Sequence, residues 1–165
     1  MDKSYTISVL MTKHRGALSR AIYLFTGLGY THASVSLDEE DVYYSFNKKG
    51  FRKERPKLYK ESITKSICYK ISVSKHEYEK MMETINDFQS KRPDLKYSKL
   101  GVVLCCMGIS HKFKGQYFCS QFVAELLENA DVITLKRSPS VYSPKKLNAL
   151  IRGHINLLEV VSNPI

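Results

Sequence analysis

The sequence predicts an α+β fold in which an antiparallel sheet packs against helices. Two observations lead to this class. Segments rich in β-forming residues do not alternate regularly with helical ones, and several helical segments begin at recognisable capping residues. The 165 residues include 43% hydrophobic and 25% charged residues, as in ordinary globular proteins. This length corresponds to about one domain, so we expect residues 1–165 to form a single domain.

The first half of the chain predicts three strands and one short helix. Tyr5–Met11 alternates apolar and polar residues, which predicts a strand. Residues 19–25 predict a short helix that ends at Gly27 and Gly29. Thr31–Leu37 and Val42–Asn47 are β-rich and flank an acidic tetrapeptide, which predicts a hairpin.

The centre of the chain predicts a strand followed by a helix. The strand is Tyr69–Val73, and Ser74 then begins a helix, with Glu77 completing a capping box. Apolar residues at helical spacing form the inner side of this helix: Tyr78, Met81, Met82, Ile85 and Phe88. Leu100–Met107 is an apolar segment that we expect to be buried, as either a helix or a strand.

The last third of the chain predicts two helices and a strand. Phe118–Glu128 carries its apolar residues on one helical face. Ser143 and Pro144 are typical of an N-cap and a first helical residue, and this helix extends to Leu150. Ile155–Val161 predicts a final strand.

The charge of the chain is strongly positive. There are 26 Lys and Arg residues against 16 Asp and Glu, a net charge of +10. Residues 48–60 contain seven basic residues and one acidic residue, with Phe51, Leu58 and Tyr59 among them. This segment predicts either contact with an anionic partner, such as an acidic substrate, a membrane surface or nucleic acid, or a flexible solvated loop.

Other features argue against a membrane span, a secretory signal and a zinc site. The longest nearly uninterrupted apolar run is Gly101–Ile109, far below the ~20 residues of a spanning helix. The N-terminus lacks the pattern of a secretory signal, so we expect a cytoplasmic protein. The four cysteines form no C-x-x-C pair, which predicts free thiols and no metal cofactor: Cys68, Cys105, Cys106 and Cys119.

Cys119 is the first candidate for chemistry. It begins the helix of Phe118–Glu128 and shares the face of Phe122 and Val123. Free backbone N–H groups and the positive end of the helix dipole favour a thiolate at that position. The same N–H groups are suited to stabilise an oxyanion. The alternative is a buried structural cysteine.

His32 is the candidate base. It shares a strand face with Ser34 and Ser36, and it is either an exposed polar residue or the group that activates a thiol. A third group would orient the imidazole. The hairpin brings Tyr44, Ser45 and Asn47 near His32, and the register of pairing decides which of them faces it.

Three segments resemble a known family, the circularly permuted branch of the NlpC-type papain-like cysteine hydrolases, which includes YiiX-like proteins. The first is Phe25–Gly27 followed by Tyr30–Val35 with its histidine, the second is Tyr43–Phe46, and the third is Tyr117–Leu127 with its cysteine. Tyr142–Pro144 resembles the start of the helix that follows in the family. The histidine precedes the cysteine, which is the permuted order.

The resemblance implies a papain-like fold with a cysteine nucleophile at a helix N-terminus. Cys119 would be the nucleophile, His32 the general base, and Tyr44, or alternatively Ser45, the third position. The implied activity is cysteine-dependent hydrolysis of an amide or another acyl bond in a peptide-like or acyl substrate. The alternatives are lipid acyl hydrolysis or transfer, and a catalytically inactive module that binds an anionic ligand. The resemblance implies no cofactor.

Overall fold

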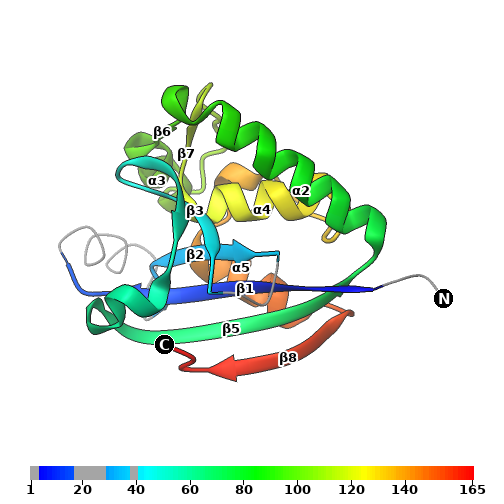
Figure 1. Ribbon diagram of the computed structural model, residues 1–165. Coiled ribbons are helices and arrows are strands. Elements are labelled where there is room, and N and C mark those ends of the chain that lie inside the picture. The colour runs from blue at the N-terminus through cyan, green and yellow to red at the C-terminus, as the bar shows by residue number, and fades with distance from the viewer. Residues whose placement is uncertain (1–3, 17–28, 38–40) are drawn as a thin grey trace.

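The computed structural model describes residues 4–16, 29–37 and 41–165, and its centre is a six-stranded antiparallel sheet (Figure 1). The strand order is β4-β3-β2-β1-β5-β8. The bounds are β1 Tyr5–His14, β2 His32–Ser36, β3 Tyr43–Asn47, β4 Gly50–Glu54, β5 Ile63–Val73 and β8 Leu157–Ser162. Two short parallel strands form a second sheet, β6 Lys96–Tyr97 and β7 Gln116–Tyr117.

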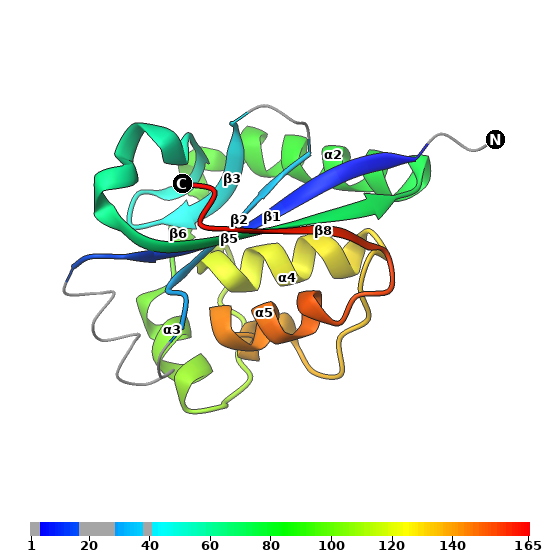
Figure 2. The same ribbon diagram turned by 90° about the horizontal axis from the view of Figure 1, so that it is seen from below.

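Helices cover the sheet and enclose the core. The α-helices are α2 Lys75–Ser90, α3 Lys99–Cys106, α4 Cys119–Asn129 and α5 Pro144–Arg152. The 3-10 helices are η1 Pro56–Ser62, η2 Arg92–Asp94 and η3 Pro139–Val141. Helix α4 contacts both α2 and α5 and packs on β2 and β3 (Figure 2). No described helix is long and apolar enough to cross a membrane.

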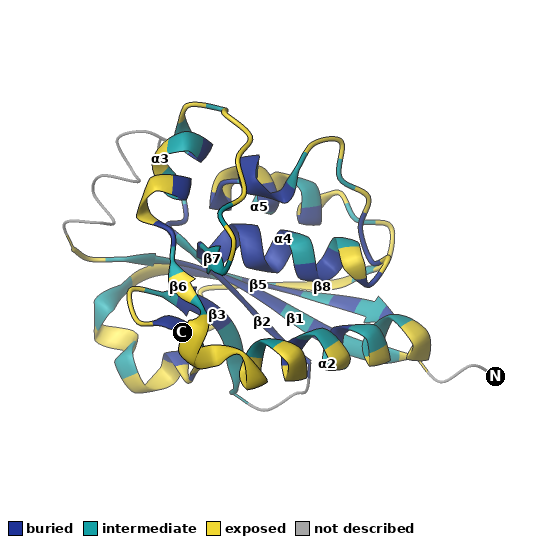
Figure 3. Ribbon diagram, turned by 90° about the horizontal axis from the view of Figure 1, so that it is seen from above, coloured by how far each residue is buried: buried dark blue, intermediate teal, exposed yellow. Residues whose placement is uncertain are grey.

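The core forms where α4 meets the sheet. Alternate residues of β1, such as Val9 and Met11, are fully buried, and so are Phe122 and Leu127 of α4. Figure 3 shows α4 as the most continuously buried helix, whereas α2 presents an exposed outer side. Burial on this scale fixes the position of the first residue of α4 relative to the central strands.

Most of the predicted elements are confirmed, including the caps. Ser74 accepts from the Glu77 backbone N–H, and the Glu77 side chain accepts from Ser74 N–H, so α2 begins with a complete capping box. Ser143 caps α5, with Pro144 as its first residue. The predicted hairpin is present as the antiparallel pair β2 and β3. The expected helix at residues 19–25 lies outside the described residues.

Three segments differ from the expectation: the strand predicted at Tyr69–Val73, the apolar segment Leu100–Met107, and the basic segment of residues 48–60. Strand β5 begins at Ile63 rather than Tyr69 because it pairs with β1 along nearly its whole length. The segment Leu100–Met107 forms α3, yet three of its apolar side chains are exposed: Leu100, Val103 and Met107. The core side of α3 is only Gly101 and Cys105, so apolar content alone overestimated its burial.

The basic segment of residues 48–60 is ordered structure rather than a loop. It contains β4, an edge strand paired with β3, and most of η1. Gly50 opens β4 with φ +86°, in the left-handed region that favours glycine. A Cβ at this position would collide with the backbone carbonyl oxygen of Leu95. The tight turn therefore requires glycine, and it fixes the start of β4.

Candidate active site

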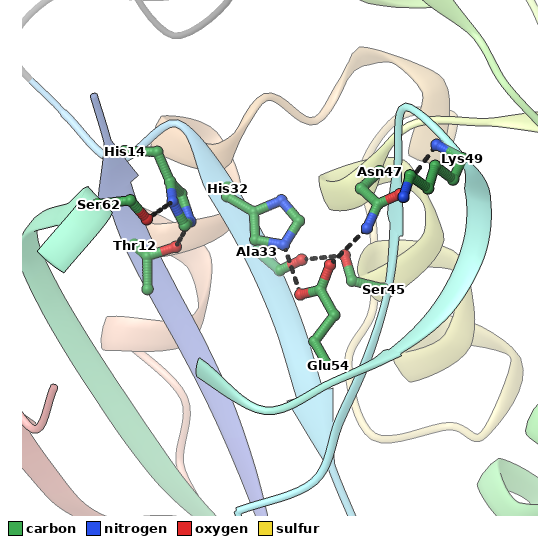
Figure 4. Close-up of polar contacts among 9 residues, drawn as sticks. All are labelled: Thr12, His14, His32, Ala33, Ser45, Asn47, Lys49, Glu54 and Ser62. Carbon is green, nitrogen blue, oxygen red and sulfur yellow. Dashed lines mark hydrogen bonds and ion pairs between the residues drawn. The ribbon is translucent and has the colours of Figure 1, made fainter. Parts of the chain in front are cut away.

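His32 lies at the start of β2, where it pairs in register with Thr12 of β1. Its Nε2 is 2.9 Å from Oε2 of Glu54, and the two side chains are only 15% and 8% exposed (Figure 4). A histidine and a carboxylate this close and this shielded form a charge-assisted hydrogen bond. The imidazole is therefore held by a carboxylate from a strand two places away in the sheet.

Glu54 reaches His32 from β4, the edge strand on the far side of β3, through a side-chain contact. Glu54 pairs with Tyr43, and the tight turn that ends at Gly50 places β4 antiparallel to β3. Asn47 Nδ2 donates to Oε1 of Glu54 at 3.2 Å, while Asn47 Oδ1 accepts from the Lys49 backbone N–H at 2.9 Å. Both carboxylate oxygens are thus engaged, and the turn residue Asn47 helps to orient the group (Figure 4).

Cys119 is the first residue of α4 and is buried. Its thiol lies near the His32 side chain, and this contact contributes to the raised pKa of that histidine. Nε2 of the imidazole is bonded to Glu54, which leaves Nδ1 for another group. The side chain of Phe118, the N-cap residue, makes no hydrogen bond to the first turn. The first backbone N–H of α4 that is bonded to a carbonyl is that of Phe122, which donates to Phe118. The N–H groups before it lack intrahelical partners.

The electrostatics of these groups favour a charged pair. Burial by itself lowers the pKa of His32, but the charge of Glu54, the hydrogen bond that His32 donates to it and the nearby Cys119 thiol raise it well above its ordinary value of 6.5. Burial raises the pKa of Glu54, and its interactions with His32 and Asn47 bring it below its ordinary value. The imidazolium and the carboxylate therefore stabilise each other.

A second histidine lies beside the site, and the sequence did not single it out. The rings of His14 and His32 are 5.6 Å apart in an edge-to-face arrangement. His14 Nε2 is 2.9 Å from Thr12 Oγ1, and its Nδ1 is 3.3 Å from Ser62 Oγ. Burial and the nearby charge of His32 lower the pKa of His14 to about 4, so it is neutral near pH 7.

The two third-position candidates lie elsewhere. Tyr44 pairs with Val35, which is three residues from His32 and so about 10 Å along β2. Its ring stacks on Phe51. Ser45 is fully buried and donates from its Oγ to the Ala33 carbonyl at 2.6 Å. The structure brings Cys119 and His32 together and gives His32 Glu54 as its partner.

Sequence reasoning missed Glu54 because it looked for a third group in the hairpin strand. Glu54 lies in the next strand, inside a segment dominated by positive charge. One signal was available, since Glu54 is the single acidic residue among residues 48–60. A lone carboxylate in a basic segment is a candidate for a specific ion pair. In the structure Glu54 is buried, and buried carboxylates are normally paired.

Cys119 and His32 open onto a cavity of about 820 Å³. Tyr97 and Tyr59 also line it, and burial raises the pKa of both phenols. The remainder of its wall is mainly basic: Arg15, Lys48, Lys49, Arg52, Lys53 and Arg55. The cavity is large enough for a small organic ligand to reach the thiol.

No protein-family model matches the sequence, and neither does any curated protein. The fold is similar to that of a solved structure described as the metalloprotein yiiX from Escherichia coli O157:H7. The TM-score is 0.54 at 18% sequence identity, over 97% of this chain and 89% of that chain. This similarity supports a YiiX-like fold with mixed α and β elements.

The description of that protein raises the question of a metal. Within residues 4–16, 29–37 and 41–165, no three His, Cys, Asp or Glu side chains are grouped so that they could hold a metal ion. His32 and Glu54 are bonded to each other, which engages Nε2 of the imidazole. The described residues therefore do not fit a metal centre, and the reaction proposed below uses side chains alone.

Proposed function

We propose that this protein is a cysteine-dependent hydrolase of an amide or another acyl bond. One observation carries the proposal: the His32 imidazole is bonded to the Glu54 carboxylate and lies near the Cys119 thiol, at the wall of an open cavity. Nucleophile, base and orienting group in this order form the general triad of acyl transfer. Glu54 takes the third role that the sequence placed at Tyr44 or Ser45.

The steps follow from these positions. His32 holds the proton of the Cys119 thiol as an imidazolium, and the resulting thiolate attacks the substrate carbonyl carbon to form a tetrahedral oxyanion. Collapse of the oxyanion expels the leaving group, which takes the proton from His32 and leaves an acyl thioester on Cys119. A water molecule gives its proton to His32 and attacks the thioester, which releases the acid and restores the thiol.

Two features of the fold support these steps. The unpartnered N–H groups at the start of α4 are placed to donate to the oxyanion, and the helix dipole is positive there. Glu54 compensates the charge of the imidazolium, which matches the raised pKa of His32. The order of histidine strand before cysteine helix, together with the YiiX-like fold, favours a permuted papain-like enzyme. A peptide-like amide is the default substrate bond, and an ester or thioester fits the same chemistry.

The test is the reactivity of Cys119. Iodoacetamide near neutral pH should alkylate Cys119 faster than the other cysteines, as mapped by mass spectrometry over time. His32→Ala should slow the alkylation of Cys119 and change its pH profile. Cys119→Ser should abolish turnover of p-nitrophenyl butyrate, while Cys106→Ser, a change at a partly exposed thiol, should retain it.

Folding of each variant is checked by thermal unfolding, since Cys119 is buried. Full turnover by a folded Cys119→Ser protein would contradict the proposal. So would an unchanged alkylation profile in a folded His32→Ala protein.

A second candidate is a binding module for an anionic ligand, which the basic wall of the cavity favours. It predicts tight binding of small anions by the wild-type protein without turnover of any acyl substrate. It also predicts that alkylation of Cys119 does not depend on His32. The alkylation experiment therefore separates the two functions.

A further inference from the structure

The cavity that contains Cys119 is strongly asymmetric in charge. Six basic side chains line it, and Glu54 is the only carboxylate among its described lining residues. Glu54 is already engaged by His32 and Asn47. No other described lining residue offsets the positive charge, so the cavity attracts anions.

A second basic cavity adjoins the first. It has a volume of about 710 Å³ and shares Lys48, Lys49, Arg52 and Tyr97 with the first cavity. Arg92 and Lys96 extend its basic wall, and none of its described lining residues is acidic. The two cavities meet along the turn between β3 and β4. A ligand that starts at Cys119 and passes Arg52 therefore enters a region where every charged wall residue is positive.

Arg52 lines both cavities and carries a hydrogen-bond donor that has no acceptor among the described residues. Its Nη2 donates to the Lys49 carbonyl at 3.0 Å, which fixes the guanidinium against the turn. Its Nε is shielded from solvent and has no partner among the described residues. A buried N–H without an acceptor is costly, and an anionic ligand would supply the acceptor.

The hollow shape bears on the kind of anion. A membrane surface or a nucleic acid is bound by a broad basic surface, whereas these residues line two adjoining hollows, the first of which leads to a buried thiol. A small anionic group at the end of an acyl substrate fits this arrangement. Carboxylate and phosphate share the geometry that a guanidinium recognises.

We infer that Arg52 determines specificity for acyl substrates that carry a terminal carboxylate or phosphate, held between the two basic cavities while the acyl carbon lies at Cys119. This inference rests on the proposed hydrolase function and adds the class of its substrate. The neighbouring lysines Lys48 and Lys49 strengthen the field, but Arg52 alone is positioned by its own backbone contact.

The test compares three matched p-nitrophenyl esters: the neutral butyrate, the hydrogen glutarate with a terminal carboxylate, and the 4-phosphonobutyrate. Wild-type kcat/KM should be higher for one or both anionic esters, and the better of the two identifies the anion. Arg52→Gln should lower the anionic-to-neutral ratio of kcat/KM about tenfold or more. Arg52→Lys should restore part of the ratio, since it keeps the charge.

Lys57→Gln is the matched control. Lys57 lies in the same basic segment, is exposed, and does not line either cavity. The substitution therefore removes an equal charge and should leave the anionic-to-neutral ratio of kcat/KM unchanged. An unchanged ratio in a folded Arg52→Gln protein would overturn the inference. Equal losses for the neutral and anionic esters, or an equal drop in the ratio with Lys57→Gln, would also overturn it.

A binding measurement separates this inference from the proposed function. If no ester is turned over, the hydrolase proposal fails, and calorimetric titration with 4-phosphonobutyrate, glutarate and butyrate decides about Arg52. Anion binding that weakens about tenfold in Arg52→Gln but not in Lys57→Gln supports the anion site by itself. Absence of binding, or binding that does not depend on Arg52, refutes it.

Discussion

Glu54 lies 22 residues after His32, on the edge strand of the sheet, yet its Oε2 is 2.9 Å from His32 Nε2. Two side chains separated this far in sequence meet because β2, β3 and β4 are consecutive antiparallel strands. The carboxylate fixes the imidazole through Nε2, and Cys119 lines the same cavity. The charge of Glu54, and not only its shape, therefore contributes to the site.

The first prediction concerns this charge. Glu54→Gln should lower the pKa of His32, because burial then acts on the imidazolium without a carboxylate to oppose it. Turnover near pH 7 should fall about tenfold or more, part of the ~10²–10⁴ that a positioned acid–base group contributes. NMR titration of the ring protons gives the pKa, and steady-state kinetics gives kcat/KM.

The control for this change is Glu61→Gln. Glu61 is exposed in η1, so the same chemical change should leave both the His32 titration and turnover as in the wild type. A merely structural role for Glu54 would lower the melting temperature without moving the His32 titration. That outcome would remove Glu54 from the proposed triad.

The second prediction concerns pH and His14. Its pKa is about 4 in the folded protein and 6.5 ordinarily, so the unfolded chain binds a proton that the folded chain excludes. The free energy of unfolding should therefore fall as the pH is lowered from 6.5 towards 4, and this contribution is complete above 6.5. The titratable groups that lie near His14 and face its imidazole are His32, Glu54 and Tyr59.

The contributions of His32 and Glu54 to stability change with pH mostly outside this range. The raised pKa of His32 stabilises the fold below 6.5, and that contribution is lost as the pH rises through the folded value. The lowered pKa of Glu54 adds a loss only as the pH falls below about its ordinary 4.5. Urea unfolding across this range should thus show a shallower acid slope in His14→Gln than in the wild type. An identical slope would contradict the burial argument for His14.

The sequence predicted the helix that begins at Cys119, the strand that carries His32 and the caps of α2 and α5, because these depend on local patterns. The apolar face of α4 and the capping box at Ser74 are encoded within a few residues. The antiparallel hairpin of β2 and β3 followed from two β-rich segments with a polar connection.

Strand β4 was not predicted from the sequence, and the reason is physical. It is an edge strand of five residues in which only Gly50, Phe51 and Glu54 are buried, so it shows no regular apolar alternation. The contact of Glu54 with His32 joins strands on the two sides of β3, which no local window of sequence contains. The same limit applies to Tyr44, because the register places it beside Val35 and not beside His32.

The third prediction separates Tyr44 and Ser45 from catalysis. Ser45→Ala removes a buried hydrogen bond to the Ala33 carbonyl and should cost about 1–2 kcal/mol of stability while leaving kcat/KM near the wild-type value. Tyr44→Phe keeps the ring against Phe51 and should change neither quantity by much. Denaturant unfolding and ester kinetics measure the two effects. A large loss of turnover in either stable variant would restore that residue as a candidate for orienting His32.

The fourth prediction concerns the turn that positions β4. Gly50→Ala places a Cβ against the Leu95 carbonyl at a backbone φ of +86°, so the turn has to shift or strain by about 1–3 kcal/mol. Both Glu54 and Arg52 lie downstream on the same short strand, and β6 packs against it through the Leu95 region. The variant should therefore lose stability and turnover together, as measured by thermal melting and ester kinetics.

Gly108→Ala is the matched comparison for that turn. Gly108 also has a positive φ of +73°, but nothing lies within 4 Å of the Cβ that alanine would add. It should show the backbone strain alone, with turnover unchanged because α3 ends away from β4. If Gly50→Ala lost stability no more than Gly108→Ala and kept full turnover, the close approach of Leu95 would not be what holds β4, and with it Glu54, in place beside His32.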